Sequence, residues 1–382
     1  MKSFTFLMHN IYALGGTVKA VSQLANTLAE RGHDVTIVSV LRAADTPYFA
    51  LNNNIKVIDL VDYRLKPQNI SGIIANRIRK FTPLLKPKKI SKYEPGLSQL
   101  SSFIEKKIIA CIKQTATDVL VGTRASYNIL VAQFAPKNVF TIGMEHMNFD
   151  AHPTRYQHQI IRAYQGLDAV TTLTDSDQFA YQQRIQTPVY IVPNIINHRF
   201  IGAQKQNIII SAGRLDYEKG YDLLIEAARR IQDDLRQIRY QIHIYGEGKE
   251  KAALINMIEQ YNLNDIIKLF PATKDLDKKL SRSKITVVPS RNEGFGMVIL
   301  EAMAQHNIVI SFKDTLGPSY IINAGTNGYL ADYGDAGSLA KYIDIATQYY
   351  TKLTPMIEAG QQTLKQYTAD HVYAAFMAIF KG

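Results

Sequence analysis

The sequence predicts an α/β protein built from two successive domains, each a doubly wound parallel sheet. Short apolar runs alternate with helix-like segments along most of the chain, the pattern of parallel strands covered by helices on both faces. Residues 193–206 interrupt this alternation with Pro193 and Asn194, and the pattern then starts again. A length of 382 residues, 46% of them hydrophobic, is enough to fill two cores. We therefore predict an N-terminal domain over residues 1–192, a connection over 193–206 and a C-terminal domain over 207–382.

The N-terminal part predicts a right-handed βαβ unit followed by more strands of the same sheet. Residues 4–8 are apolar and strand-like, and the glycine pair Gly15-Gly16 follows them. Residues 19–31 carry apolar side chains at helical spacing, and residues 35–40 form a second buried strand. Further strands are expected at residues 119–121, 139–142, 170–173 and 190–192.

The C-terminal part repeats this design. It begins with a strand at residues 207–212 and a helix at 221–231, and its last helix is expected to pack back on the N-terminal domain. Further strands are expected at residues 240–245, 267–270, 285–289 and 308–311. Open α/β sheets bind ligands beyond the carboxyl ends of their strands. Two such Rossmann-like domains facing each other predict a binding cleft between them.

The composition excludes several classes of protein. The single cysteine, Cys111, cannot form an internal disulfide, and no cysteine cluster has the spacing of a metal site. The N-terminal residues lack the long apolar region of a signal peptide, and no run approaches the ~18 apolar residues of a spanning helix. These observations predict a cytoplasmic protein that is soluble or attached peripherally to the inner face of the cell membrane.

The formal charge of +11 is concentrated in one segment, residues 64–107. This segment holds eleven Lys or Arg against Glu94 and Glu105, a net charge of +9, interleaved with apolar residues. Such a segment can dock on an anionic membrane or an anionic polymer, and the alternative is a solvated basic face. No recognisable nucleic-acid-binding motif accompanies the charge, so nucleic acid is not an expected partner. The candidate docking lysines are Lys86, Lys88, Lys89 and Lys92.

The first motif with chemical content lies in residues 211–220, between a predicted strand and a predicted helix. Arg214 offers a planar fork of donors and Lys219 a compact cation, both close to a helix N-terminus that favours anions. This arrangement suits a diphosphate. Taken alone, an Arg and a Lys in a loop are more often solvated charges.

The second motif, residues 289–302, has the same position at the end of another predicted strand. A glycine-flanked loop exposes Glu293, and a helix is expected to begin near Met297. The glycines at 294 and 296 let the backbone approach a ligand and present its N–H groups. Glu301 lies one to two turns into the helix, where it can reach ribose hydroxyls or, as the alternative, be an ordinary surface residue.

This second string resembles the E-x7-E signature of the retaining glycosyltransferases of family four, which have the GT-B fold. Glu293 and Glu301 stand at its two carboxylate positions, with Gly294-Phe295-Gly296 between them. The resemblance extends over most of the chain. Further matching positions are Gly15-Gly16, Val192-Pro193-Asn194, Arg214, Lys219, Gly246-Glu247-Gly248, Gly325, Asn327-Gly328 and Leu330.

The resemblance implies a role for each matching residue. Arg214 and Lys219 would neutralise the diphosphate of the donor, Glu293 would position its sugar and Glu301 would bind the ribose. His146 falls where the family has a His or Asn near the reacting face of the sugar. The remaining implied donor contacts are Gly15, Gly16, Gly213, Gly246, Pro271, Gly294, Phe295, Gly296, Met297 and Val298. No metal and no other cofactor is implied.

Two departures from the family pattern stand out. Ala272 replaces a glycine that the family usually has near the nucleotide base, which weakens the expectation of uracil recognition there. Gly317-Pro318 keeps the family's Gly-Pro pair in altered surroundings. Neither change touches the predicted diphosphate site.

The resemblance implies transfer of a sugar from a UDP-sugar, with retention at the anomeric carbon, to a hydroxyl of an acceptor. Within the family, the basic N-terminal segment resembles that of enzymes that build bacterial cell-surface polysaccharides or teichoic acids, which implies a cell-surface glycan, a teichoic acid or a lipid-linked acceptor. One alternative is a nucleotide-sugar epimerase or phosphorylase with similar domains, against which the complete E-x7-E string argues. The other is an inactive, glycan-binding partner subunit, which would typically have lost the Arg, Lys or Glu residues present here.

Overall fold

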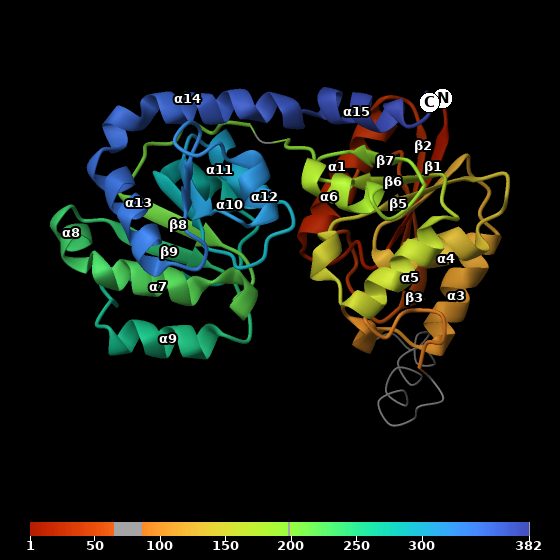
Figure 1. Cartoon of the computed structure of the whole chain (residues 1–382), viewed down its shortest axis with the longest axis horizontal. Coiled ribbons are helices and arrows are strands. Elements are labelled where there is room, and N and C mark those ends of the chain that lie inside the picture. The colour runs from red at the N-terminus through yellow and green to blue at the C-terminus, as the bar shows by residue number, and fades with distance from the viewer. Residues whose placement is uncertain (65–85, 198, 382) are drawn as a thin grey trace. The chain divides into compact units, whose positions relative to one another are not determined.

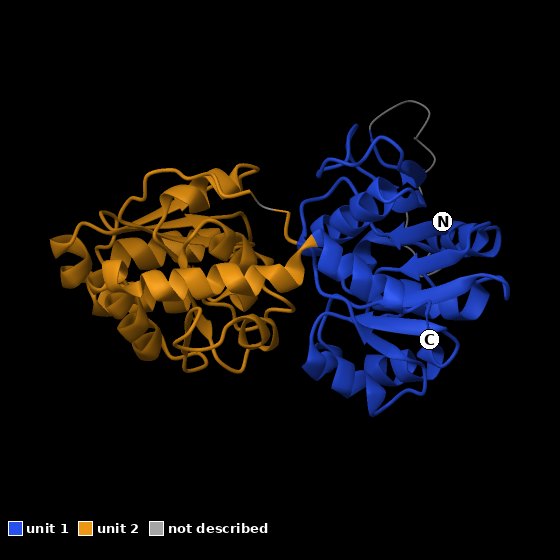
Figure 2. Ribbon diagram, turned by 90° about the horizontal axis from the view of Figure 1, so that it is seen from above, with its two compact units in different colours: residues 1–195, 369–382 blue, residues 196–368 orange. Residues whose placement is uncertain are grey.

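The computed structural model describes residues 1–64, 86–197 and 199–381. The chain divides into two compact units (Figure 2): unit 1 is Met1–Ile195 with Ala369–Gly382, and unit 2 is Ile196–Thr368. The first change of unit therefore falls inside the predicted connection, residues 193–206. The second falls just before the last helix, α15 (Ala369–Ala378), which belongs to unit 1.

Among the described residues, unit 1 has a seven-stranded parallel sheet in the order β3-β2-β1-β4-β5-β6-β7. Its strands are β1 (Ser3–Met8), β2 (Asp34–Arg42), β3 (Lys56–Asp62), β4 (Val119–Gly122), β5 (Phe140–Met144), β6 (Ala169–Thr172) and β7 (Val189–Ile191). Strand β3 was not predicted from the sequence. It is an edge strand that is only half buried, and the charged residues Lys56 and Asp59 break its apolar run.

Helices cover both faces of this sheet (Figure 1). In the described part of unit 1 the helices are α1 (Gly16–Glu30), α3 (Ser102–Lys113), α4 (Ala125–Phe134), α5 (Thr154–Tyr164), α6 (Asp175–Gln182) and α15, with short 3-10 helices η3 (Leu97–Gln99) and η4 (Phe149–Ala151). Because side chains alternate along a strand, β1 feeds two cores. Phe4 and Phe6 pack in the core with α1 and α15, and Leu7 packs in the core with α3, α4 and α5.

Among the described residues, unit 2 has a six-stranded parallel sheet in the order β10-β9-β8-β11-β12-β13. Its strands are β8 (Ile208–Ala212), β9 (Gln241–Tyr245), β10 (Ile267–Phe270), β11 (Ile285–Val288), β12 (Ile308–Phe312) and β13 (Tyr329–Ala331). Its helices are α7 (Tyr221–Arg230), α8 (Gln232–Gln237), α9 (Lys251–Gln260), α10 (Leu276–Arg282), α11 (Met297–Ala304), α12 (Leu316–Ile321), α13 (Ala336–Gln348) and α14 (Thr354–Thr363), with 3-10 helices η5 (Tyr217–Lys219), η6 (Tyr350–Leu353) and η7 (Leu364–Tyr367).

Two doubly wound α/β units confirm the predicted fold class. In each sheet the chain order reverses beside the first strand of the unit, so β1 lies between β2 and β4, and β8 lies between β9 and β11. The carboxyl ends of strands at such a switch point are the usual ligand-binding positions of open α/β sheets. In the part of the chain that the structure describes, no helix is long and apolar enough to span a membrane.

Candidate functional site

The two predicted motifs of unit 2 follow the neighbouring strands β8 and β11, at the switch point of the sheet. The Lys219 Nζ donates to Glu293 Oε2 at 2.6 Å, and Ser290 Oγ lies 3.3 Å from the same oxygen. The side chains of Lys219 and Glu293 are about one-fifth exposed, at 21% and 18%. The structure therefore brings together the ammonium and the carboxylate that the sequence placed in separate motifs.

Arg214 lies apart from this pair. Its side chain is 78% exposed and makes an ion pair of 3.1 Å with Asp216. The fork of the guanidinium is thus in contact with solvent and can change partner at low cost. Its contact with a diphosphate stays a prediction.

Helix α11 begins as predicted at Met297, and Gly296 at its N-cap has φ +91°, a conformation that favours glycine. A glycine cap offers no side chain to the first N–H groups of the helix, which leaves them for an anion. Phe295 is buried and packs against Tyr367 with ring centroids 5.7 Å apart, so it anchors the loop. Glu301 is only 4% exposed, which rules out the alternative that it is an ordinary surface residue.

Gly246, at the end of β9, has a structural reason to be glycine. A Cβ there would lie 2.0 Å from the carbonyl oxygen of Gly213, so the two strand-end loops pack backbone to backbone. This packing holds the start of the loop that carries Arg214. Pro271 and Ala272 follow β10 in an exposed segment. Contacts of Gly213, Gly246 and Pro271 with a donor stay predictions.

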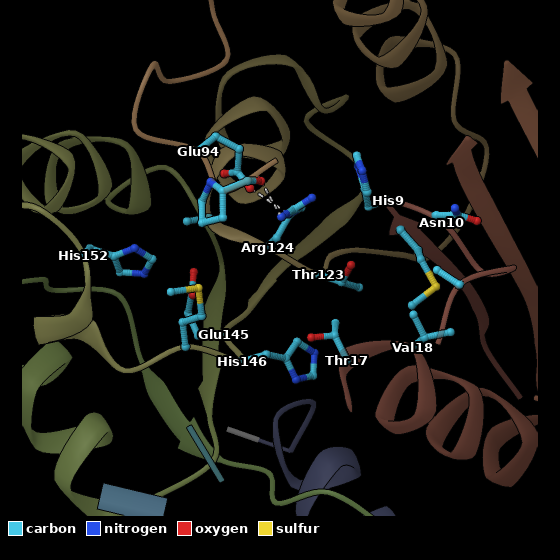
Figure 3. Close-up of a pocket in the computed structure, with 15 residues that line it drawn as sticks. His9, Asn10, Thr17, Val18, Glu94, Thr123, Arg124, Glu145, His146 and His152 are labelled. Atoms are coloured by element: carbon cyan, nitrogen blue, oxygen red, sulfur yellow. Dashed lines mark hydrogen bonds and ion pairs between the residues drawn. The ribbon is translucent and has the colours of Figure 1, made fainter. Parts of the chain in front are cut away.

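Unit 1 contains a cavity of about 210 Å³ at the carboxyl ends of β1, β4 and β5 (Figure 3). His146, predicted as a site residue, lines it together with Thr17 and Val18 from the first turn of α1. Gly15 and Gly16 stand at the start of that helix, and a Cβ on Gly16 would meet no atom within 4 Å. The glycine pair therefore leaves open space at the N-terminus of α1.

Burial lowers the pKa of His146 to about 4, so its imidazole is uncharged at neutral pH. Its Nε2 is buried and has no hydrogen-bond partner within the described residues. An uncharged imidazole can donate a hydrogen bond to a sugar hydroxyl or accept one from it, but it cannot supply a positive charge. His146 thus suits a positioning contact better than neutralisation of a diphosphate.

His9 also lines the cavity and was missed in the sequence analysis. Its Nε2 lies 2.8 Å from Gln99 Oε1, which can only accept, so Nε2 carries the proton. Its Nδ1, 2.7 Å from the Tyr127 hydroxyl, therefore accepts. Burial, and secondarily the charge of Arg124, lowers the pKa of His9 to about 4. Both ring nitrogens are engaged, which fixes the ring as part of the cavity wall.

Arg124 and Glu94 form a second missed group in this wall, and Figure 3 shows them turned toward each other. The Arg124 Nε lies 2.7 Å from Glu94 Oε1, and the Glu94 side chain is only 1% exposed. Glu94 Oε2 also accepts from the Tyr156 hydroxyl at 2.5 Å and from the Ser126 backbone N–H at 3.2 Å. Three donors and the N-terminus of α4 stabilise this buried carboxylate.

Glu145, beside His146, completes the wall. It accepts hydrogen bonds from Tyr164 and, at 2.8 Å, from Asn128, while burial raises its pKa to about 7. Position after a strand is the signal that could have identified these residues. His9 follows β1, Arg124 follows β4 and Glu145 follows β5.

The basic segment is described only in part. Lys66, Arg77, Arg79 and Lys80 and the apolar residues 70–85 lie outside the described residues. Lys86, Lys88, Lys89 and Lys92 are all exposed. Glu105 is buried and accepts from the backbone N–H groups of Lys88, Lys89 and Ile90 at 3.0, 2.6 and 2.8 Å. The two acidic residues of the segment, Glu94 and Glu105, are thus inside the protein, and the lysine side chains are left on the surface.

Among the residues that the structure describes, no group of three or more His, Cys, Asp or Glu side chains is arranged to hold a metal ion. Independence from metal stays a prediction.

Comparison with known proteins connects this geometry to a family. Residues 195–363 match the family "Glycosyl transferases group 1". An exopolysaccharide phosphotransferase of Streptomyces coelicolor is 26% identical over 98% of the chain, which spans 40% of that protein's length. An N-acetylgalactosaminyltransferase of Campylobacter jejuni that acts on an undecaprenol-linked glycan is 23% identical, with 97% of this chain and 96% of that one covered.

A poly(ribitol-phosphate) α-N-acetylglucosaminyltransferase of Staphylococcus aureus is 25% identical over 62% of this chain and 49% of its own length. Among solved structures, TarM of S. aureus, crystallised with UDP, superimposes with a TM-score of 0.78 at 16% identity and covers both chains completely. The chain therefore has the GT-B fold, and the match of its residues 195–363 to the glycosyl transferases group 1 family supports a glycosyltransferase.

Proposed function

We propose that the chain transfers a sugar from a UDP-sugar to a hydroxyl of an anionic cell-surface glycan, a teichoic acid or a lipid-linked glycan, with retention at the anomeric carbon. The observation that carries this proposal is the 2.6 Å contact between Lys219 and Glu293 at the switch point of unit 2. A cation that suits a phosphate thus lies next to a carboxylate that suits sugar hydroxyls. A nucleotide-sugar presents these two groups side by side.

In the proposed reaction Lys219 and Arg214 bind the diphosphate and stabilise the negative charge that develops on it as the sugar leaves. The N–H groups at the start of α11 add to this stabilisation. Lys219 exchanges its present partner, Glu293, for a phosphate oxygen, and the Glu293 carboxylate becomes available to accept from the sugar. Lys219 and Arg214 are together proposed to take the place of a metal ion. Glu301 is proposed to hold the ribose and His146 a hydroxyl of the transferred sugar.

Retention can be achieved on one face of the sugar. The bond between the anomeric carbon and the phosphate oxygen breaks, and the acceptor oxygen bonds to the same face. The acceptor proton passes to the departing phosphate oxygen, so no carboxylate is needed as a nucleophile.

The proposed acceptor rests on two observations. The relatives from S. aureus and C. jejuni are named for a poly(ribitol-phosphate) and an undecaprenol-linked glycan as acceptors. Lys86, Lys88, Lys89 and Lys92 present an exposed basic face that would attract a phosphate polymer or an anionic bilayer. The proposal places the enzyme in the cytoplasm, peripherally on the inner face of the cell membrane.

The direct test is release of UDP from a panel of UDP-sugars, with and without poly(ribitol-phosphate) or an undecaprenol-linked glycan. We expect UDP release that depends on one sugar and on an acceptor, and NMR of the product should show the anomeric configuration of the donor. An epimerase would interconvert UDP-sugars without releasing UDP, and an inactive binding subunit would bind the acceptor without turnover. Either result would replace the proposal.

A further inference from the structure

Arg291 fastens the two motif loops of unit 2 to each other. It follows β11 in the loop that carries Glu293, and its guanidinium binds Asp222 in the first turn of α7 through two parallel contacts, Nη1 to Oδ1 at 2.8 Å and Nη2 to Oδ2 at 2.6 Å. Nη1 also donates to the carbonyl of Tyr217 at 2.8 Å, and the guanidinium lies 4.0 Å from the centre of the Tyr217 ring. A planar fork with five donors is suited to such a set of partners.

The backbone strengthens the same connection. The N–H groups of Arg291 and Asn292 donate to the carbonyl of Glu218 at 2.8 and 3.4 Å. Gly220, at φ +66°, passes so close to the end of β11 that a Cβ would lie 2.0 Å from the carbonyl oxygen of Pro289. Lys219 stands between Glu218 and Gly220. Its backbone is therefore held against the second loop on both sides.

This matters because lysine is a long, flexible side chain. Holding its Nζ near one oxygen costs side-chain entropy, and a backbone that is already fixed lowers that cost. The Lys219 ammonium reaches Glu293 at 2.6 Å only if residues 217–220 keep their place relative to residues 289–293. The Arg291 side chain is 16% exposed and lies between these two segments.

We propose that Arg291, with Asp222, is a positioning element of the donor site, which holds the loop of Lys219 against the loop of Glu293 and so presents the ammonium to the diphosphate. Arg291 acts through Lys219 and is not itself a catalytic residue. This inference rests on the proposed function in one respect, the identity of the diphosphate ligand.

The first experiment needs no ligand. Amide hydrogen exchange of the full chain is compared between wild type, Arg291→Met and the matched control Arg236→Met. Arg236 also binds a carboxylate with two nitrogens, Asp265 at 2.8 and 3.3 Å, and a backbone carbonyl, that of Asn262 at 2.9 Å, but it lies outside the two loops. We expect exchange at residues 217–220 and 291–292 to accelerate about 5-fold or more in Arg291→Met and to stay unchanged in Arg236→Met. Equal exchange in both variants would overturn the proposal.

The second experiment is a double-mutant cycle on the dissociation constant of UDP, measured by calorimetry for wild type, Arg291→Met, Lys219→Ala and the double variant. We expect Arg291→Met to weaken UDP about 5- to 10-fold when Lys219 is present and less than about 2-fold when it is absent. Arg291→Lys, which cannot make both contacts to Asp222, should fall between wild type and Arg291→Met.

The same loss in both backgrounds would show that Arg291 acts independently of Lys219, and the proposal would be dropped. Wild type that binds no UDP would refute the proposed function instead, and hydrogen exchange would then decide the positioning role alone.

Discussion

The candidate residues of the two units differ in their charge and in their contact with solvent. In unit 2, Lys219, Glu293 and Arg214 are in contact with solvent and form ion pairs whose partners can be exchanged. In unit 1, His9 and His146 are uncharged at neutral pH because burial lowers the pKa of each to about 4, and the charged pair Arg124 and Glu94 is occupied by its own contacts. The proposed function therefore assigns anion binding to unit 2, whereas the cavity of unit 1 offers shape and hydrogen bonds. A substitution that removes a charge from unit 2 should therefore leave the buried cavity of unit 1 unchanged, and a substitution in the cavity should leave anion binding in unit 2 unchanged.

The largest expected effect is on the charges of unit 2. Lys219→Ala and Arg214→Ala should each lower turnover about 10²-fold or more, because each removes a cation from the charge that develops on the diphosphate. Steady-state kinetics of UDP release measure this. Lys278→Ala is the control, because Lys278 lies in the same unit, is 70% exposed and is paired with Asp275 at 2.9 Å. Turnover close to wild type in either site variant would remove that residue from the proposed mechanism.

A smaller effect is expected on the basic face of unit 1. Replacing Lys86, Lys88, Lys89 and Lys92 together with Gln should weaken binding to poly(ribitol-phosphate) or to vesicles containing anionic lipid about 10-fold or more at low salt. A lysine near an anionic surface contributes about 1 kcal/mol, and several act together. Salt screens exposed charges over ~8 Å at physiological ionic strength, so the difference from wild type should shrink as salt rises.

The affinity for the UDP-sugar serves as the internal control of this variant, because none of the four lysines belongs to unit 2. Glu105 holds the backbone N–H groups of Lys88 and Lys89, which these substitutions keep, so the local fold should not be disturbed. If the variant kept wild-type binding to both the polymer and the vesicles at low salt, the segment would be only a solvated basic face.

A third effect concerns the stability of unit 1 in acid. The pKa of His146 is about 4 in the folded chain and about 6.5 in an unfolded one, so the unfolded state binds more protons between these values. The stability that depends on an uncharged His146 is therefore present above pH 6.5 and is lost as the pH falls toward 4. Between pH 7 and pH 5, the free energy of unfolding, measured with urea, should fall by about 1–2 kcal/mol less in His146→Gln than in wild type.

Glu145 affects the pH dependence of stability in the opposite direction, because burial raises its pKa to about 7. Its contribution is complete below its unfolded value and is lost as the pH rises through 7. Both proteins keep Glu145, so the difference between wild type and His146→Gln isolates the histidine. Parallel stability curves for the two proteins would mean that His146 is not held uncharged by burial.

The fold and the loops of unit 2 could be predicted from the sequence because their signals are local. Buried parallel strands are continuous apolar runs, and Glu293, Gly294 and Gly296 are close neighbours in the chain. Strand β3 escaped prediction because an edge strand is only half buried. Helix α1 starts at Gly16 rather than at residue 19, because the glycine pair was interpreted as a loop.

The cavity of unit 1 could not be predicted in the same way. His9, Glu94, Arg124 and Glu145 are far apart in sequence, and only the strand order brings them together. An isolated histidine or arginine carries no signal of its partner. The contact between Lys219 and Glu293 could be predicted only in part. Each motif is a local signal in the sequence, but the two residues meet only because β8 and β11 are neighbours in the sheet.

The smallest expected effect is that of removing divalent metal ions. EDTA should change the rate of UDP release less than about 2-fold, because the proposed mechanism has Lys219, Arg214 and the N-terminus of α11 supply the positive charge that a metal ion would otherwise provide. Rates are compared in buffer with EDTA, with Mg²⁺ and with Mn²⁺ at equal ionic strength, so that screening of the lysine face does not imitate a metal effect. Loss of activity in EDTA with recovery in Mn²⁺ would mean that the charge of unit 2 is incomplete without a metal.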